Sequence, residues 1–255
     1  MQSQETDLKI SNLITRYAKA QFDTHCKFLL DSTLNAWTKN ILLSNKYPLV
    51  VQKEESPLLL FFEDRVTETL RFTILNSLIM CRLRMRAILY TVPSALDKLK
   101  DFLSDLKDWL DIVPIKDIET FAGENYSNLL KRKSFWENIP AKKVLIVHTD
   151  ALLIEPIDFE IFNYDYIGAP WSPSKYLSIP IYRYSKDLMS ENGTHWFTYK
   201  FNVNNEKITS GEISFGNGGL TIRDTAKMIE ICNLEPSTNK EPEDVYFGRL
   251  LRSTK

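Results

Sequence analysis

The sequence predicts an α/β protein with an open, mostly parallel β-sheet. Short, continuous apolar runs, such as LLLFFE at residues 58–63 and KVLIV at residues 143–147, are typical of strands that are buried on both faces. Segments with apolar side chains at helical spacing lie between these runs, so strands and helices alternate along the chain. The chain has 255 residues, of which 44% are hydrophobic, and this is enough to bury a sizeable core.

The first 56 residues have a different pattern and are expected to form a helical extension. Residues 8–22 carry apolar side chains near helical spacing, and a second stretch from about His25 to Leu43 repeats the pattern. The segment that follows is interpreted as a linker that ends at Pro57. We therefore expect a helical N-terminal extension at residues 1–56, which is a candidate for self-association, and a catalytic α/β domain at residues 57–255.

The alternation of strands and helices is clear from residue 58 to Asp150. The run at residues 142–150 is the strongest strand of the chain, because its apolar residues are continuous and β-branched residues are frequent in it. The expected order is strand 58–63, helix 67–80, strand 86–92, a helix from Pro93 to about Leu110, strand 111–117, helix 125–139 and strand 142–150.

After Asp150 the pattern loosens. Residues 163–171 contain one more strand-like piece, and residues 172–196 show no clear period, which fits either an active-site loop or a small hairpin. Residues 212–224 are expected to form two strands joined by a tight glycine turn at 216–219. Asp224 is expected to be the N-cap of a helix that runs to Cys232, and residues 242–252 begin another helix.

Composition and termini exclude several classes of protein. The formal net charge is -1, so no overall field favours binding to nucleic acid or to acidic membranes. The three cysteines, Cys26, Cys81 and Cys232, are odd in number and far apart, which is not the pattern of a disulfide framework. The polar N-terminus is not a signal peptide, and no apolar run approaches the roughly 20 residues of a membrane span. We therefore expect a cytoplasmic protein without a transmembrane segment.

Two groups of polar residues follow expected strands and are candidates for ligand binding. Ligands of open α/β sheets bind beyond the carboxyl ends of the strands. A nucleotide would be recognised there by the residues after the first strand and by those after the strongest strand. A carboxylate at position 150 can reach a diphosphate through a divalent ion, although it can also cap the next turn. These candidates are Glu63, Asp64, Arg65, His148, Thr149 and Asp150.

Two further segments are candidates for binding a sugar or an acceptor. Three of the eight glycines of the chain lie at residues 216–219, where glycine would allow a ligand to approach the backbone closely, or would simply form a hairpin with a bulge. Trp171 is either a core residue or a ring that stacks on a sugar. The candidates for substrate binding are Trp171, Gly216, Asn217, Gly218 and Gly219.

Glu243 and Asp244 are candidates for acid–base chemistry. They follow Pro242 and lie in the expected first helical turn, where the helix dipole favours carboxylates for structural reasons alone. The functional alternative is that one of them acts as a general base, which removes the proton from an attacking hydroxyl group.

Four motifs follow one another in a specific order: HTD at residues 148–150, DYIGAPW at 165–171, GNGGLTIR at 216–223 and PEDVYFG at 242–248. This order resembles a microbial and fungal family of glycosyltransferase-like domains of unknown function, whose members carry QTD, YDYIGAPW, GNGGLSLR and PEDVYF. The resemblance covers about residues 57–252. More distantly, the order is similar to that of β-1,3-galactosyltransferases and Fringe-like enzymes, which have the GT-A fold.

The resemblance implies a GT-A-like fold, in which a Rossmann-type mixed sheet flanked by helices binds a nucleotide-sugar, and it assigns roles to several residues. Asp150 matches the last carboxylate of a DxD-type motif, the usual metal contact, whereas His148 stands where the first aspartate would be. A neutral imidazole can bind Mn²⁺ but suits Mg²⁺ poorly. Residues 216–219 match the acceptor-side wall, and Asp244 matches the general base, with Glu243 beside it.

The expected function is therefore that of a glycosyltransferase. It would move a sugar from a nucleoside diphosphate donor, in the first place a UDP-sugar, to a hydroxyl of a glycan or protein acceptor, with inversion and with Mn²⁺ or Mg²⁺ as cofactor. Two alternatives stay open. One is an inactive module that binds a sugar or a nucleotide, which the histidine at position 148 favours. The other is a nucleotidyltransferase, which would need a second metal-binding carboxylate beside Asp150.

Overall fold

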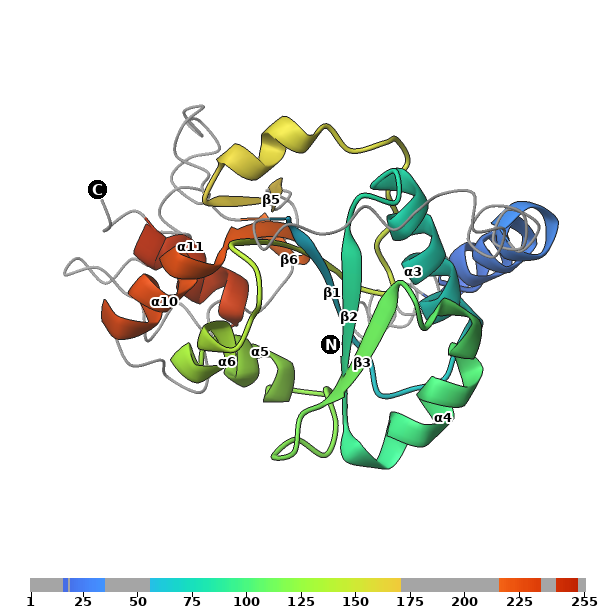
Figure 1. The fold of residues 1–255 in the computed structure, drawn as a ribbon, viewed down its shortest axis with the longest axis horizontal. Helices are drawn as coiled ribbons and strands as arrows, with labels where there is room; N and C mark the ends of the chain where they lie inside the picture. The colour runs from blue at the N-terminus through green and yellow to red at the C-terminus, as the bar shows by residue number, and fades with distance from the viewer. Residues whose placement is uncertain (1–15, 18, 35–55, 171–215, 235–241, 252–255) are drawn as a thin grey trace, which may run out of the picture.

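The computed structural model of the chain describes residues 16–17, 19–34, 56–170, 216–234 and 242–251. In these ranges the strands form one mixed sheet with the order β3-β2-β1-β4-β6-β5 (Figure 1). The strands β1 to β4 run parallel to one another, whereas β6 runs antiparallel to both β4 and β5. The strands are β1 (Leu58–Phe62), β2 (Arg86–Thr91), β3 (Leu110–Pro114), β4 (Lys143–Val147), β5 (Tyr166–Pro170) and β6 (Gly216–Asp224).

Helices cover both faces of this sheet. The helices α3 (Glu68–Met80) and α4 (Leu96–Phe102) lie on one side of it, and α5, α6, α10 and α11 lie on the other (Figure 1). Because both faces are covered, β1 is buried at all five positions and β4 at four of five. The expected Rossmann-type mixed sheet flanked by helices is thus confirmed. The helices of the second side are α5 (Asn125–Leu130), α6 (Lys133–Glu137), α10 (Thr225–Leu234) and α11 (Glu243–Leu251).

Two expected helices are shorter than the sequence pattern suggested. The helix expected from Pro93 to Leu110 is regular only in α4, between short 3₁₀ turns at Pro93–Ala95 and Ser104–Leu106. The chain must reach the sheet edge early, because the carbonyl oxygen of Trp109 already accepts a hydrogen bond from the N–H of Ala87 (2.9 Å).

The helix expected at residues 125–139 is divided into α5 and α6. The break lies at Arg132, whose backbone is extended. The buried indole N–H of Trp136 donates to the carbonyl oxygen of Leu130 (2.6 Å), which would otherwise lack a partner at the end of α5. A local hydrogen bond from a side chain therefore stabilises the end of the first helix at a point where the periodicity alone would continue it.

The prediction of a glycine turn at residues 216–219 is wrong. These four residues are the first part of β6, and Gly216 and Asn217 pair with Pro170 and Ala169 of β5. The pairing register shifts between Gly168 and Ala169, so the glycine-rich stretch forms an irregularity inside a strand rather than a reversal of the chain. The strand expected before residue 216 lies outside the described residues.

The described part of the N-terminal extension is helical, as expected. Residues 19–29 form a helix that continues into a π-helical turn at Leu30–Leu34. Cys26 and Leu30 are each only 1% exposed and belong to the same apolar core as β1 and α3. The helix is therefore docked on the α/β unit, while the proposed domain boundary at residue 56 stays a prediction.

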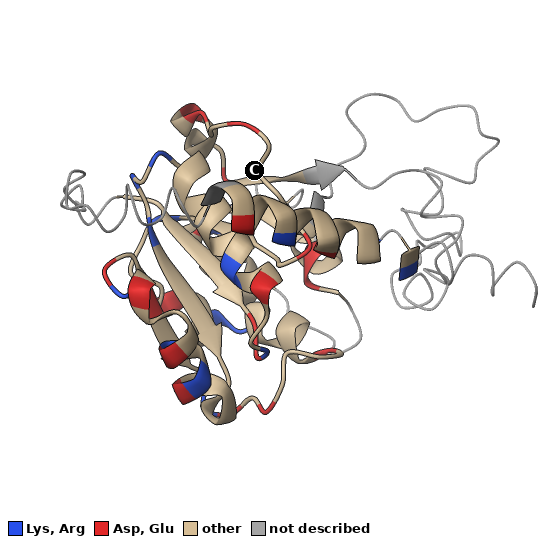
Figure 2. Cartoon of the chain, turned by 90° about the vertical axis from the view of Figure 1, so that its right-hand side faces the viewer, with Lys and Arg blue, Asp and Glu red and all other residues tan. Residues whose placement is uncertain are grey.

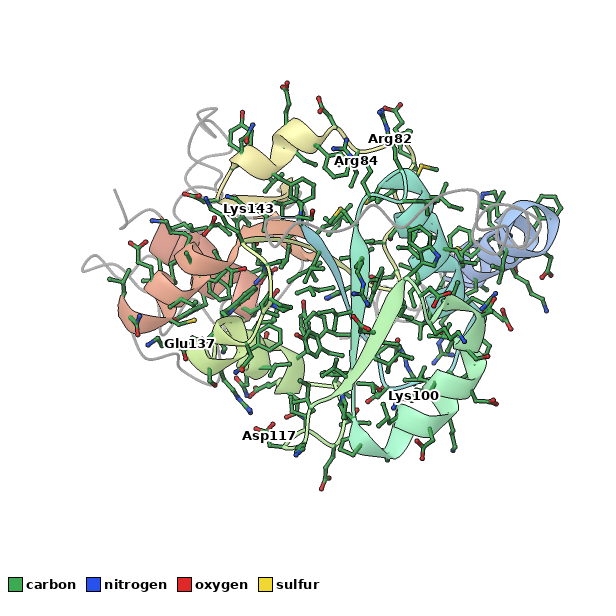
Figure 3. All side chains as sticks on the ribbon, viewed as in Figure 1. Arg82, Arg84, Lys100, Asp117, Glu137 and Lys143 are labelled. Carbon is green, nitrogen blue, oxygen red and sulfur yellow. The ribbon has the colours of Figure 1, made fainter. Side chains whose placement is uncertain are left out.

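Acidic and basic residues are distributed over the helices and loops with both signs mixed (Figure 2), which agrees with the small net charge. The apolar side chains fill the space between the sheet and the two groups of helices (Figure 3). Lys143, labelled in Figure 3, lies at the start of β4 and pairs with Asp224 (3.0 Å), so it joins the two antiparallel strands.

Within the described parts of the chain, no helix has the length and apolar character to cross a membrane.

The docking of the N-terminal helix gives a stability prediction. Leu30→Ala should lower the free energy of unfolding by about 2–5 kcal/mol, because it leaves a cavity in a shared core. Phe28→Ala, on the same helix but with a 65% exposed side chain, is the matched control and should have little effect. The measurement is urea unfolding of the full chain. Equal, small effects of both variants would contradict docking.

Candidate functional site

A pocket of about 470 Å³ lies beyond the carboxyl ends of β1 and β4. It brings together all six residues that the sequence assigned to nucleotide binding, from two segments that are more than 80 positions apart. Parallel neighbouring strands explain this, because their carboxyl ends meet at one edge of the sheet. The lining residues are Lys19, Phe62, Glu63, Asp64, Arg65, Thr120, Phe121, Ala122, Gly123, Tyr126, His148, Thr149 and Asp150.

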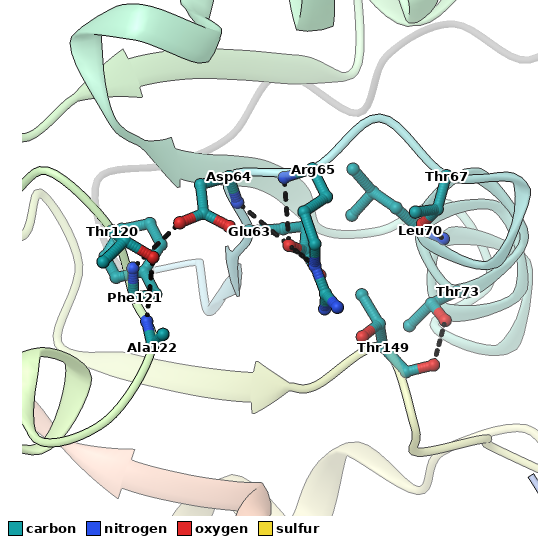
Figure 4. Close-up of polar contacts among 10 residues, drawn as sticks. All are labelled: Glu63, Asp64, Arg65, Thr67, Leu70, Thr73, Thr120, Phe121, Ala122 and Thr149. Carbon is teal, nitrogen blue, oxygen red and sulfur yellow. Dashed lines mark hydrogen bonds and ion pairs between the residues drawn. The ribbon is translucent and has the colours of Figure 1, made fainter.

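Glu63 organises the loop after β1. Its carboxylate is buried and accepts hydrogen bonds from the backbone N–H groups of Asp64 and Arg65 (3.0 Å each). It also accepts from Nε and Nη2 of Arg65, at 2.8 Å each (Figure 4). This pairing raises the pKa of Arg65 and fixes a guanidinium group whose side chain is 65% exposed. Glu63 thus positions a cation at the pocket and has little capacity left to bind a ligand itself.

Asp64 connects this loop to the loop after β3. Its carboxylate accepts a hydrogen bond from the backbone N–H of Phe121 (3.0 Å) (Figure 4). Burial alone would raise the pKa of Asp64, but hydrogen bonds from Thr120 and Phe121 outweigh it and lower the pKa. Gly123 in the same loop has φ +65°, which only glycine adopts without strain. Sequence reasoning missed this wall at residues 120–123, because no motif marks it.

Aromatic rings form the floor of the pocket. The ring of Phe62 lies 5.1 Å from that of Tyr126 and 5.9 Å from that of Phe121, measured between centroids. The ring of Tyr126 in turn lies 4.8 Å from the imidazole of His148. Such faces suit the planar base of a nucleotide or the apolar face of a sugar. The sequence shows these residues as apolar or helical, without a sign of their place in a pocket.

His148 is held at the end of β4 by its backbone, and its side chain is largely buried. Its backbone N–H donates to the carbonyl oxygen of Gly219 (2.8 Å). Burial lowers the pKa of the imidazole. The negative charges of Glu243 and Asp150 act to raise this pKa, but the effect of burial is larger. The buried Nε2 atom has no hydrogen-bond partner in the described structure. A neutral ring nitrogen without a partner can accept a proton or bind a metal ion.

Asp150 is exposed at the pocket, and no described residue pairs with its carboxylate. The alternative that it caps the following turn finds no support among the described contacts, because the N–H of Leu153, which such a cap could bind, donates to Asn76 Oδ1 (3.1 Å). Asp150 and His148 together offer one carboxylate and one imidazole, a pair that fits Mn²⁺ better than Mg²⁺. No group of three or more His, Cys, Asp or Glu side chains is arranged for a metal within the described residues, so ligand oxygens would have to complete the coordination.

Glu243 and Asp244 begin α11, as expected, but both are buried. Glu243 Oε1 accepts a hydrogen bond from Nη2 of Arg223 (2.8 Å), and its Oε2 accepts from the backbone N–H of Asp244 (2.7 Å). Arg223 has no exposed surface and lies 5.1–5.9 Å from the ring centroids of Trp136, Tyr166 and Phe247. Glu243 is therefore the counterion of a buried arginine.

Gly218 makes this ion pair possible. A β-carbon at this position would lie 2.0 Å from Glu243 Oε1, so only glycine lets the carboxylate come this close to β6. The close approach that the sequence suggested for a ligand is thus made by a side chain of the same protein. Gly219 contributes its carbonyl oxygen to the bond with His148. Trp171 lies outside the described residues.

Asp244 has the properties of a carboxyl group that titrates near neutrality. Burial, and next the charge of Glu243, raise its pKa to about 7. The N–H groups of Val245 and Gly218 and the charge of Arg223 oppose this shift. Asp244 does not line the pocket, as far as the described residues form it.

Three buried polar atoms at the pocket and near α11 have unused hydrogen-bonding capacity. The hydroxyl of Tyr126, Nε2 of His148 and Nη1 of Arg223 are buried without hydrogen-bond partners in the described structure. Tyr126 and His148 lie on the pocket wall; burial raises the pKa of Tyr126 and lowers that of His148, and the charge of Glu243 acts to raise both pKa values. Buried polar atoms are rarely left without partners, so these three atoms can accommodate polar groups of a ligand or water.

The buried ion pair gives the second prediction. Glu243→Ala should lower the free energy of unfolding by about 3–5 kcal/mol, because it leaves the charge of Arg223 buried without a partner. Glu137→Ala removes a carboxylate from an exposed pair with Lys133 and should cost less than about 1 kcal/mol. Chemical denaturation of both variants measures the difference. Similar losses for the two would show that Arg223 does not depend on Glu243.

Among solved structures, the chain is similar to the mannosyltransferase PcManGT from Pyrobaculum calidifontis in complex with GDP-Man and Mn²⁺. The sequence identity is 10%, the TM-score is 0.41, and the match covers 90% of this chain and 60% of that one. This chain therefore spans 60% of the length of that structure. No curated protein matches the chain.

A sequence model described as "Protein of unknown function (DUF5672)" matches residues 111–255, which is more than half of the 255 residues. The match includes β4, β6, α11 and the four motifs on which the resemblance to a domain family of unknown function was based. On this evidence the chain belongs to the DUF5672 family of proteins.

Proposed function

We propose that the protein is a glycosyltransferase that uses a nucleoside diphosphate sugar, in the first place a UDP-sugar. One observation carries the proposal: a single pocket at the carboxyl ends of β1 and β4 contains an aromatic floor, a fixed guanidinium group and the His148–Asp150 pair. These are groups that suit a base, a diphosphate and a divalent ion, respectively. The order of the four motifs supports the same function.

Different residues of the pocket would bind different parts of the donor. The rings of Phe62, Phe121 and Tyr126 would contact the nucleoside. Arg65 would bind the diphosphate through those guanidinium N–H groups that do not donate to Glu63. Asp150, with the ring nitrogen of His148, would hold Mn²⁺. When bound, the ion supplies neutralisation of the negative charge that develops on the departing diphosphate.

Asp244 is the proposed general base. A carboxyl group with a pKa of about 7 is half ionised at neutral pH and accepts a hydroxyl proton far better than an ordinary aspartate. An acceptor hydroxyl of a glycan or protein would lose its proton to Asp244 while its oxygen attacks the anomeric carbon. The bond from this carbon to the diphosphate oxygen breaks, and a single displacement inverts the configuration.

A second candidate is a module that binds a nucleotide-sugar without catalysis. It is favoured by the burial of Asp244, which is only 5% exposed, and by the engagement of Glu243 with Arg223. Release of a nucleoside diphosphate that depends on an acceptor separates the two candidates, since a binding module releases none.

The metal proposal predicts that Asp150→Asn weakens binding of UDP in the presence of Mn²⁺ by at least about tenfold, because a ligand of the ion is lost. Binding of uridine, which has no phosphate, should not change. Calorimetry with both compounds measures the effect. Unchanged UDP affinity would show that Asp150 does not bind a metal ion that contacts the diphosphate.

The base proposal predicts that Asp244→Asn lowers kcat by about 10²–10⁴-fold while the donor Kd stays near that of the wild type. The wild-type rate should rise with pH and level off above about 7, because the base must be ionised, and the variant should lose this rise. Steady-state kinetics with one working acceptor provide the test. A variant with nearly normal kcat would exclude Asp244 as the base.

The same pKa predicts an effect on stability that needs no substrate. The pKa is raised from 3.8 to about 7 by folding, so between these values the folded state keeps a proton that the unfolded state has released. The stabilisation is therefore present below about pH 4 and is lost as the pH rises through 7. Asp244→Asn should flatten this part of the curve of unfolding free energy against pH. An unchanged slope would mean that Asp244 is an ordinary, ionised carboxylate.

A further inference from the structure

Lys19 lines the proposed donor pocket, although it belongs to the N-terminal helix rather than to the α/β unit. No pattern in the sequence connects this helix with the site. We propose that Lys19 binds the diphosphate of the donor and that the helix of residues 19–29 is a wall of the donor site. This inference rests on the proposed function, because it assumes a nucleoside diphosphate in this pocket.

The position of Lys19 follows from the docking of its helix. Cys26 and Leu30 are buried in the core, and Phe22 packs partly buried against it. The spacing 19, 22, 26 and 30 places these four residues on one face of a helix. Lys19 therefore stands at the end of the buried stripe, where the apolar contacts stop and the pocket begins.

Two adjoining pockets meet at Lys19. A second pocket of about 380 Å³ lies between the N-terminal helix and the start of α3, and it shares Lys19, Arg65, Thr149 and Asp150 with the first. These shared residues contain two cations and the carboxylate proposed to hold the metal. A diphosphate placed there would have cationic groups on both sides, and its two ends could extend into separate pockets.

The charges of the pocket favour a role for Lys19 in particular. The guanidinium of Arg65 is already paired with Glu63, and the carboxylate of Asp64 is bound to the loop after β3. Lys19, by contrast, is exposed and forms no ion pair with a carboxylate of the described residues. An exposed ammonium group that forms no ion pair within the described residues, at the side of a pocket, is a ready partner for phosphate oxygens.

The experiment uses the full-length chain and the substitutions Lys19→Ala, Lys19→Arg and Lys27→Ala. Lys27 is exposed on the same helix and lines neither pocket, which makes it the matched control. Calorimetry with Mn²⁺ measures the affinity for UDP and GDP and for the nucleosides uridine and guanosine. Unfolding by urea checks that all variants remain as stable as the wild type.

Lys19→Ala should weaken binding of the preferred nucleoside diphosphate about 5- to 20-fold, as for the loss of one charge-assisted hydrogen bond. The affinity for the matching nucleoside should not change, Lys19→Arg should restore most of the binding, and Lys27→Ala should bind as the wild type does. Unchanged diphosphate affinity in Lys19→Ala, or an equal loss with the nucleoside, would overturn the role of Lys19 but leave the proposed function standing. Failure of the wild type to bind either diphosphate would overturn both.

Discussion

The buried ion pair between Arg223 and Glu243 is the interaction on which the site depends. It joins β6 to α11 in an interior where neither charge has access to water, so each needs the other. Gly218 makes room for the carboxylate, and aromatic rings surround the guanidinium. Burial is the main cause that raises the pKa of Asp244 to about 7, and the negative charge of Glu243 beside it adds to this shift. A structural pair thus contributes to the chemistry of its neighbour.

The shape of the pocket depends on two carboxylates that form hydrogen bonds within the protein. Glu63 holds Arg65 and two backbone N–H groups, and Asp64 connects the loops after β1 and β3. Both residues sit where a nucleotide would be recognised, yet their oxygen atoms are largely engaged within the protein. Recognition of a donor therefore falls to the groups that they position, which are a guanidinium and a wall of backbone and aromatic rings.

The sequence was sufficient for the sheet and for the residues that follow β1 and β4, because continuous apolar runs and the geometry of parallel strands determine both. It was misleading for residues 216–219, since glycine serves turns and close approaches equally, and only the position of Glu243 shows which applies. It could not reveal the loop at residues 120–123 or the place of Lys19. Those depend on contacts between segments that are distant in sequence, and such contacts leave no local pattern.

The central claim is that one pocket, at the carboxyl ends of β1 and β4, binds a nucleoside diphosphate. A crystal structure of the full chain with UDP and Mn²⁺ tests it most directly. We expect the base against the rings of Phe62 and Phe121, the diphosphate beside Arg65, and the ion at Asp150. Density for the nucleotide at any other surface, with this pocket filled only by solvent, would contradict the account.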